Sequence, residues 1–221
     1  VPRNVAKLVQ VESPTYARGK GLTPDQARGL LSLLSDDRLR VLYLLAVTLG
    51  MRKGELLGLK WDAVDFTKGT LTVRLALQRI KGELVLAAPK TATSVRVIPL
   101  PTFVLDALKE RRQQQEEEYK ECGPEWLDSG YVFTTAVGSP VDPRNLLRHW
   151  YALRKRAGLL DFRFHDLRHT CASLLLDLGA PPHVVREILG HAGIEVTMGV
   201  YAHASDSEKR KAIEGLTSKL S

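Results

Sequence analysis

The sequence is poor in cysteine and lacks a long apolar run. Its two cysteines, Cys122 and Cys171, are far apart, which excludes a disulfide-rich scaffold and suits a reducing compartment. The most apolar stretch, residues 41–49, is too short to cross a bilayer. No signal-peptide pattern opens the chain, which begins with valine rather than methionine. We therefore expect a piece of a longer protein that works in the cytoplasm and does not bind a membrane.

Motifs for metal ions and nucleotides are also missing. His165 and His169 lie four residues apart, but the chain has no Cys-x-x-Cys pair and no His-Glu-x-x-His motif. It also has no glycine-rich loop of the kind that holds nucleotide phosphates. These absences predict that the protein uses no metal and no cofactor.

Positive charge is in moderate excess. The chain has 32 lysines and arginines against 25 aspartates and glutamates, which gives a net charge of +7. Hydrophobic residues make up 44% and charged residues 26%, as in a globular protein with a sizeable core. The charge indicates a polyanionic partner or, equally, an ordinary basic protein, so the arrangement of the charged residues has to decide.

The hydrophobic pattern predicts a mainly helical α+β fold. Residues 1–21 have the composition of a linker. Strict alternation predicts a small three-stranded antiparallel sheet from residues 71–77, 83–88 and 94–100. Helical spacing, often preceded by a polar cap or proline, predicts helices over residues 24–34, 39–49, 53–59, 101–121, 143–156, 165–179, 182–189 and 197–203. The second half of helix 101–121 is almost wholly charged or glutamine, so we expect it in solvent.

Two pairs of residues stand out as candidates for chemistry. His165 and Arg168 share one helix face, beside an apolar stripe that we expect in the core, made of Leu167, Cys171, Leu174, Leu175 and Leu178. Their ordinary interpretation is a polar helix start, with Arg168 paired to a carboxylate. Arg52 and Glu55 are also three apart and directly follow the most buried helix. A surface ion pair is the ordinary interpretation there, but the position favours a rigid, partly desolvated guanidinium.

Three more residues gain meaning only in combination. Lys90 lies in the loop between two predicted strands, His191 follows Gly190, and Tyr201 sits among small residues. Taken singly, Lys90 would be interpreted as a solvated lysine, His191 as a loop histidine and Tyr201 as an interior tyrosine.

Four segments together resemble the catalytic domain of the tyrosine recombinases, specifically the phage-type and mobile-element integrases. They occur in the family's order and at its spacing, and the match runs from about residue 22 to the end. The segments are T-L-G-M-R-K-G-E-L-L-G-L-K-W (48–61), P-K-T-A-T-S-V-R-V-I-P-L (89–100), H-D-L-R-H-T-C-A-S-L-L-L-D-L-G (165–179) and L-G-H-A-G-I-E-V-T-M-G-V-Y-A-H (189–203).

The resemblance implies a domain organisation. Residues 22–205 are the catalytic domain with the tyrosine-recombinase fold, and residues 1–21 are a linker from a missing N-terminal DNA-clamping domain. Residues 206–221 form a C-terminal tail that packs either on its own domain or on a neighbouring protomer.

The resemblance also implies a role for each candidate residue. Tyr201 is the nucleophile, Glu55 supports the first arginine, and the other expected catalytic residues are Arg52, Lys90, His165, Arg168 and His191. Of these assignments, Lys90 competes with nearby Lys81. The implied reaction is DNA cleavage through a 3′-phosphotyrosine, resealed without metal or ATP. Two arginine forks suit the phosphate oxygens, so Arg52 and Arg168 have to converge on one phosphate-sized spot.

The partners follow from the same resemblance and from the basic helix 143–156. We expect Arg144, Asn145, Arg148 and Thr91 to contact double-stranded DNA at attachment sites, with binding that weakens steeply as salt rises. The fragment is expected as a monomer alone and as a tetramer on DNA, with an accessory DNA-bending factor as a further partner. Its source is expected to be a phage or mobile element in the bacterial cytoplasm and nucleoid.

Three other functions compete with the recombinase interpretation. A topoisomerase-like enzyme would use the same cleavage without exchanging DNA strands between partners. A DNA-binding regulator would keep the fold without the reaction. A plain basic helical domain would require the motif matches to be coincidental. The spacing from His165 to Tyr201 disfavours the first, and the full set of residue types disfavours the second.

Overall fold

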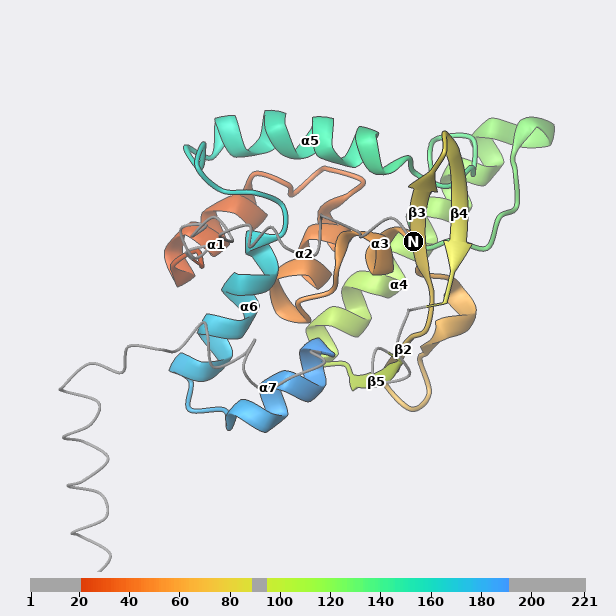
Figure 1. The fold of residues 1–221 in the computed structure, drawn as a ribbon. Helices are drawn as coiled ribbons and strands as arrows, with labels where there is room; N and C mark the ends of the chain where they lie inside the picture. Colours follow the sequence, from red (N-terminus) through yellow and green to blue (C-terminus); the bar gives the residue numbers. More distant parts are fainter. Residues whose placement is uncertain (1–20, 89–94, 191–221) are drawn as a thin grey trace, which may run out of the picture.

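The structure is a computed structural model that describes residues 21–88 and 95–190 (Figure 1). Its α-helices are α1 (Pro24–Ser32), α2 (Arg40–Thr48), α3 (Lys53–Leu57), α4 (Thr102–Cys122), α5 (Pro143–Arg156), α6 (Asp166–Asp177) and α7 (Pro182–Leu189). Its strands are β1 (Val64–Asp65), β2 (Thr70–Val73), β3 (Ala76–Ile80), β4 (Glu83–Ala87) and β5 (Arg96–Pro99). The mainly helical α+β prediction is confirmed, and each of these helices lies close to its predicted range.

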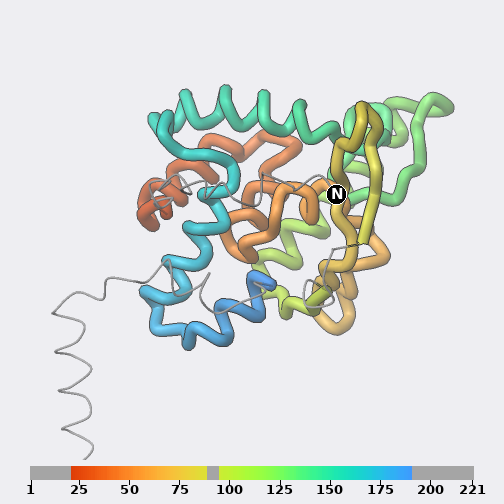
Figure 2. The backbone as a smooth tube through the Cα atoms, viewed as in Figure 1, coloured from red at the N-terminus to blue at the C-terminus, as the bar shows by residue number. Residues whose placement is uncertain are grey.

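Helix α2 lies at the centre of the core. Leu42, Tyr43 and Leu45 are all fully buried, and α1, α3, α4 and α6 pack around the helix. Burying one such side chain contributes roughly 1.5–3 kcal/mol. The backbone tube in Figure 2 shows α5 along one edge of the molecule and α7 near the opposite edge.

Local chemistry explains where the helices begin and end. Thr23 caps α1 with a reciprocal capping box to Gln26, and Asp142 caps α5 ahead of Pro143. Helix α7 ends at Gly190, whose φ of +67° lies in the left-handed region that favours glycine. These caps are the signals that the sequence displays, which is why the predicted ranges agree with the observed helices.

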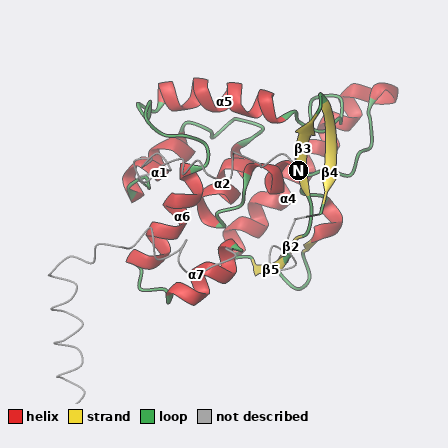
Figure 3. Ribbon diagram, viewed as in Figure 1, coloured by secondary structure: helices red, strands yellow, loops and turns green. Residues whose placement is uncertain are grey.

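The prediction of one strand over residues 71–77 is wrong. The segment forms two strands in different sheets (Figure 3), with a three-stranded sheet in the order β1-β2-β5 and a separate β3–β4 hairpin. The cause is a close backbone approach to α3, since a Cβ on Gly58 would lie only 2.8 Å from the backbone nitrogen of Leu77. Strand β3 therefore leaves the sheet to pack on α3, and the short strand β1 takes a place that was not predicted.

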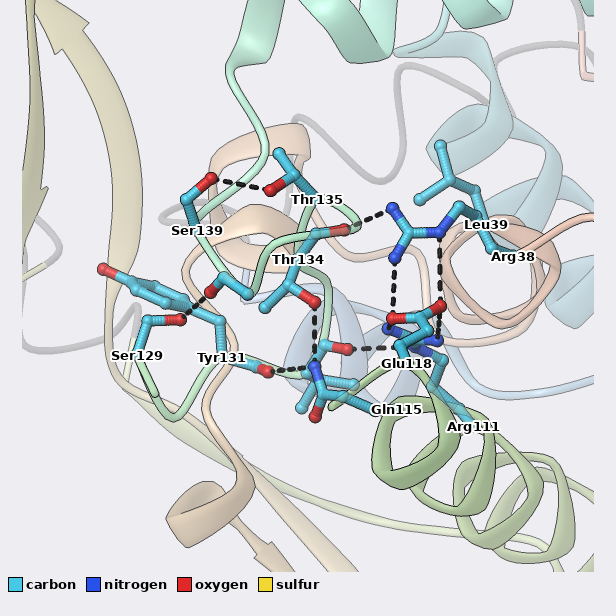
Figure 4. Close-up of polar contacts among 12 residues, drawn as sticks. Arg38, Leu39, Arg111, Gln115, Glu118, Ser129, Tyr131, Thr134, Thr135 and Ser139 are labelled. Carbon is cyan, nitrogen blue, oxygen red and sulfur yellow. Dashed lines mark hydrogen bonds and ion pairs between the residues drawn. The ribbon is translucent and has the colours of Figure 1, made fainter. Parts of the chain in front are cut away.

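The second half of α4 is not simply solvated, contrary to expectation. Arg111 is 1% exposed and donates to both carboxylate oxygens of Glu118 over 2.9 and 3.1 Å. Arg38 binds the same carboxylate, and Gln115 donates to the hydroxyl of Thr134 (Figure 4). A buried polar network therefore lies inside a stretch whose composition suggests full exposure, because arginine and glutamine can bury their stems while pairing their ends.

The apolar stripe of α6 is confirmed only in part, since Leu174 and Leu175 are half-buried rather than buried. Leu167 and Cys171 are buried, but Leu178 is 84% exposed, and Leu176 lies in the core instead. Helix α6 ends at Asp177, and Leu178 is its cap residue.

Several expected segments lie outside the described residues. These are most of the linker, the loop of residues 89–94, the helix over 197–203 and the tail of residues 206–221. None of the helices in residues 21–88 and 95–190 combines the length and apolar character needed to cross a membrane.

Candidate active site

Arg52 is fixed by the first turn of α3. Its backbone N–H donates to Glu55 Oε2 over 2.9 Å, and its Nη1 donates to Glu55 Oε1 over 2.8 Å. Its Nη2 donates to the carbonyl oxygen of Gly190 over 2.9 Å. The Arg52 side chain remains 38% exposed, whereas that of Glu55 is 4% exposed. The guanidinium is therefore held from behind and open to solvent in front.

Arg168 reaches the same place from α6. It is 3% exposed, and its Nη1 and Nη2 donate to the carbonyl oxygens of Gly50 and Leu189, each over 2.7 Å. Both guanidinium groups thus contact the end of α7, on the neighbouring residues Leu189 and Gly190. The structure brings Arg52 and Arg168 together, as the sequence analysis requires.

The two arginines influence each other electrostatically. Burial, followed by the positive charge of Arg52, lowers the pKa of Arg168 to about 9. Two like charges held together, one of them half open to solvent, favour an anion between them. Planar guanidinium forks match the oxygens of a phosphate.

Sequence reasoning missed Arg96 of β5. Its Nη1 and Nη2 donate to the two carboxylate oxygens of Glu55 over 3.2 and 3.0 Å, and its Nε donates to Ile188 O over 2.7 Å. Burial would raise the pKa of Glu55, but hydrogen bonds from Arg96 and Arg52 outweigh burial and hold this pKa below its ordinary value. Strand alternation could have indicated that Arg96 is buried, because it lies on the same strand face as Ile98. Both residues are buried, whereas Val97 between them is 63% exposed.

Two glycines allow this close approach. A Cβ on Gly50, whose φ is +59°, would lie 2.2 Å from Leu189 Cδ2. A Cβ on Gly190 would lie 3.0 Å from two atoms of the Arg96 side chain. Larger residues at either position would push apart the end of α7 and the arginines that bind it.

His165 lies at the N-cap position of α6, one turn before Arg168. The centre of its ring is 5.1 Å from the centre of the His169 ring, and the two rings are nearly perpendicular. Partial burial of the ring, with the added effect of His169 and Arg168, lowers the pKa of His165 to about 4. The imidazole is therefore neutral at pH 7 and can accept a proton. In the described ranges, no three His, Cys, Asp or Glu side chains gather into a group that could hold a metal ion.

Four of the predicted site residues lie outside the described residues. Lys90 and Thr91 belong to residues 89–94, between β4 and β5, and His191 and Tyr201 follow Gly190. Their roles, like those of the described site residues, stay predictions.

Three of the four predicted DNA-binding side chains lie on one face of α5. Arg144, Asn145 and Arg148 are exposed, whereas Leu146 and Trp150 on the opposite face are buried. The exposed face also includes Tyr151 (52% exposed), with the Arg154 guanidinium 4.7 Å from the centre of its ring. A basic helix face with an exposed aromatic ring is available to a polyanion.

Helix α5 is anchored to the core by a chain of hydrogen bonds. The hydroxyl of Tyr43 in α2 bonds to Nδ1 of His149 over 2.8 Å, and Nε2 of His149 bonds to Asp37 over 2.8 Å. At the other end, Arg79 of the β3–β4 hairpin forms an ion pair with Asp142, the cap of α5. These contacts fix the orientation of the basic face.

Comparisons with known proteins agree with this geometry. A tyrosine recombinase XerC-like protein of Caldanaerobacter subterraneus subsp. tengcongensis is 34% identical over 228 residues, covering 98% of this chain and 57% of that protein. The ICEBs1 integrase of Bacillus subtilis is 27% identical over 99% of this chain and 60% of its own length. The chain thus spans somewhat more than half the length of these curated relatives.

Solved structures show the same fold. The Tn1549 transposon integrase in complex with transposon right-end DNA superposes with a TM-score of 0.75 at 24% identity, covering 97% of this chain and 70% of that one. The XerA recombinase gives a TM-score of 0.68 at 25% identity, covering 89% and 64% of the two chains. The Phage integrase family model matches residues 20–208, a range that contains every predicted catalytic residue. By that match, this chain is a member of the phage integrase family.

Proposed function

We propose that the chain is the catalytic domain of a site-specific DNA recombinase that integrates or excises a phage or mobile element. The observation that carries the proposal is the meeting of Arg52 and Arg168 at the end of α7, with Arg52 open to solvent. A phosphodiester placed there would receive donors from both guanidinium groups.

In the proposed reaction, the Tyr201 oxygen attacks the scissile phosphorus in line with the 5′-oxygen. A Tyr–O–P bond forms and the P–O5′ bond breaks, so the bonding electron pair leaves with the 5′-oxygen. His165 takes the tyrosine proton, and Lys90 gives a proton to the 5′-oxygen. Arg52, Arg168 and His191 stabilise the charge that builds on the non-bridging oxygens.

The electrostatics of His165 suit this role. An ordinary tyrosine has a pKa near 10 and is about one part in a thousand ionised at neutral pH, so it needs a proton acceptor. Burial holds His165 neutral in the free protein. An anionic phosphate beside the ring would raise the pKa of His165 toward its ordinary value, which makes the ring a better base when DNA is bound.

Resealing reverses the same chemistry. The phosphotyrosine ester keeps the energy of the broken bond, so the 5′-hydroxyl of another strand can attack it and release Tyr201. The proposed reaction therefore consumes no nucleotide, and each of its steps uses only protein side chains and DNA.

The basic face of α5 would position the DNA. Arg144 and Arg148 would contact phosphates, and Asn145 and Thr91 would add polar contacts. On DNA we propose a tetramer, with an accessory bending factor, in the bacterial cytoplasm where the chromosome lies.

The test uses a pool of nicked duplexes with a randomised central sequence, because nicked DNA traps the covalent intermediate. We expect wild-type protein to form a protein–DNA adduct that survives denaturation and whose DNA can be sequenced to reveal the site. Tyr201→Phe is the matched control and should bind the recovered DNA without forming an adduct. DNA binding by wild type without any adduct would contradict the recombinase and favour the DNA-binding regulator.

A further inference from the structure

Arg96 links two parts of the molecule that both touch the arginine pair. From β5 it binds both oxygens of Glu55, and Glu55 in turn holds Arg52. Its Nε binds Ile188 O, in the last turn of α7. Its side chain is 6% exposed, so these bonds form where water does not compete for the donors.

The end of α7 depends heavily on such bonds. Helix α7 packs on a small hydrophobic cluster, separate from the main core, whose buried members are Cys171, Ala172, Leu176, Val185 and Leu189. The carbonyl oxygens of Ile188, Leu189 and Gly190, three consecutive residues, each accept from a different arginine, namely Arg96, Arg168 and Arg52. These are the carbonyls that a helix C-terminus leaves unpaired, and cations there are favourable.

We propose that Arg96 is a positioning residue of the active site, fixing Glu55 and the last turn of α7 so that Arg52 faces the phosphate. It also sets the point from which the chain continues to His191. This inference rests on the proposed function and assigns a role to a residue that does not itself face the solvent-open side of the pair.

The balance of charges around Glu55 predicts how the loss of Arg96 affects anion binding. Among the described residues, Arg52 and Arg96 bond to the Glu55 carboxylate and Arg168 interacts with its charge, which leaves three positive charges against one negative charge as a site for an anion. Without Arg96, the Glu55 carboxylate is left to Arg52 and competes with phosphate for that guanidinium. Anion binding and cleavage should both weaken, even in a protein that remains folded.

Arg111 offers a matched control. It is equally buried, its Nε donates to Val132 O over 3.2 Å, and its Nη1 and Nη2 donate to the two oxygens of Glu118. This is the same bonding pattern as that of Arg96, in a different network built on Glu118 (Figure 4). Arg111→Gln should therefore lower stability as Arg96→Gln does, without a specific effect on the site.

The experiment compares Arg96→Gln, Arg111→Gln and wild type, all below their melting temperatures. Inorganic phosphate is titrated by calorimetry, and adduct formation is timed on the nicked duplex recovered with wild type. We expect Arg96→Gln to cleave about 10- to 100-fold more slowly, the usual cost of losing a residue that orients an active-site group. Its phosphate affinity should fall several-fold, whereas Arg111→Gln stays close to wild type in both measurements.

A second substitution separates positioning from simple support of the fold. Adding Glu55→Gln to Arg96→Gln removes the competing carboxylate, so phosphate affinity should recover toward the wild-type value. Equal losses in Arg96→Gln and Arg111→Gln, or no recovery in the double variant, would overturn the inference. If wild type binds phosphate but forms no adduct, the proposed function fails while the phosphate arm still tests Arg96.

Discussion

Arg168→Lys is the substitution that tests the arginine pair most directly. Lysine keeps the positive charge but replaces a planar fork with a single point of donation. Arg168 spans the carbonyl oxygens of Gly50 and Leu189, each over 2.7 Å, from a side chain that is almost fully buried. The three N–H donors of an ammonium all radiate from one nitrogen, so they cannot reproduce the spacing of Nη1 and Nη2 to the two carbonyls and to a phosphate.

The magnitude follows from these contacts. Leaving one buried carbonyl without its donor costs about 1–3 kcal/mol of stability. Losing one preorganised donor to the developing charge slows such a reaction by roughly 100- to 1,000-fold. We therefore expect Arg168→Lys to fold with a lower free energy of unfolding and to lose most of its cleavage activity, with smaller losses in DNA affinity because α5 is untouched.

The assay combines urea unfolding with timed trapping of the adduct on nicked DNA. Arg40→Lys is the control, since the side chain of Arg40 is 46% exposed and pairs with Glu110, whose side chain is 59% exposed; an exposed pair of this kind contributes little. Cleavage by Arg168→Lys at the rate of wild type would refute the idea that two guanidinium forks hold the phosphate.

Three further predictions concern stability, pH and salt. Gly190→Ala forces a side chain into the left-handed region and against Arg96, so urea unfolding should show a loss of about 1–2 kcal/mol, together with slower cleavage. The pKa of His165 is lowered to about 4 on folding, so the unfolded chain binds more protons between pH 4 and 6.5. Unfolding free energy should therefore fall as the pH drops from 6.5 to 4, and His165→Gln should reduce this slope in a pH series of melts; an unchanged slope would contradict the assignment. Arg148→Gln removes one expected phosphate contact, so the slope of log affinity against log salt should fall by about one, and an unaltered slope would argue that Arg148 does not touch DNA.

Local signals in the sequence were enough to place the helices. The cap at Thr23, the Asp142-Pro143 start of α5 and the left-handed Gly190 are each set by residues within one turn of the helix end. The family motifs likewise identified Arg52 and Arg168, whose meeting the structure then displays.

What the sequence did not reveal depends on contacts between distant residues. The division of residues 71–77 into β2 and β3 follows from the approach of the Leu77 backbone to Gly58 of α3. The role of Arg96 emerges only when Glu55 and Ile188 come together around it. Arg111 is buried by its neighbours rather than by its own hydrophobicity. Periodicity describes one segment at a time, so it carries no information on such partners.

The anchoring of Gly190 on Arg52 determines how far the expected nucleophile can travel. Tyr201 is covalently joined to that fixed carbonyl through few residues, and even a fully extended chain of this length reaches at most about 40 Å. Confinement to such a volume corresponds to an effective concentration on the order of millimolar. In the proposed reaction, this tether would supply the phenol to the phosphate without an encounter from bulk solution.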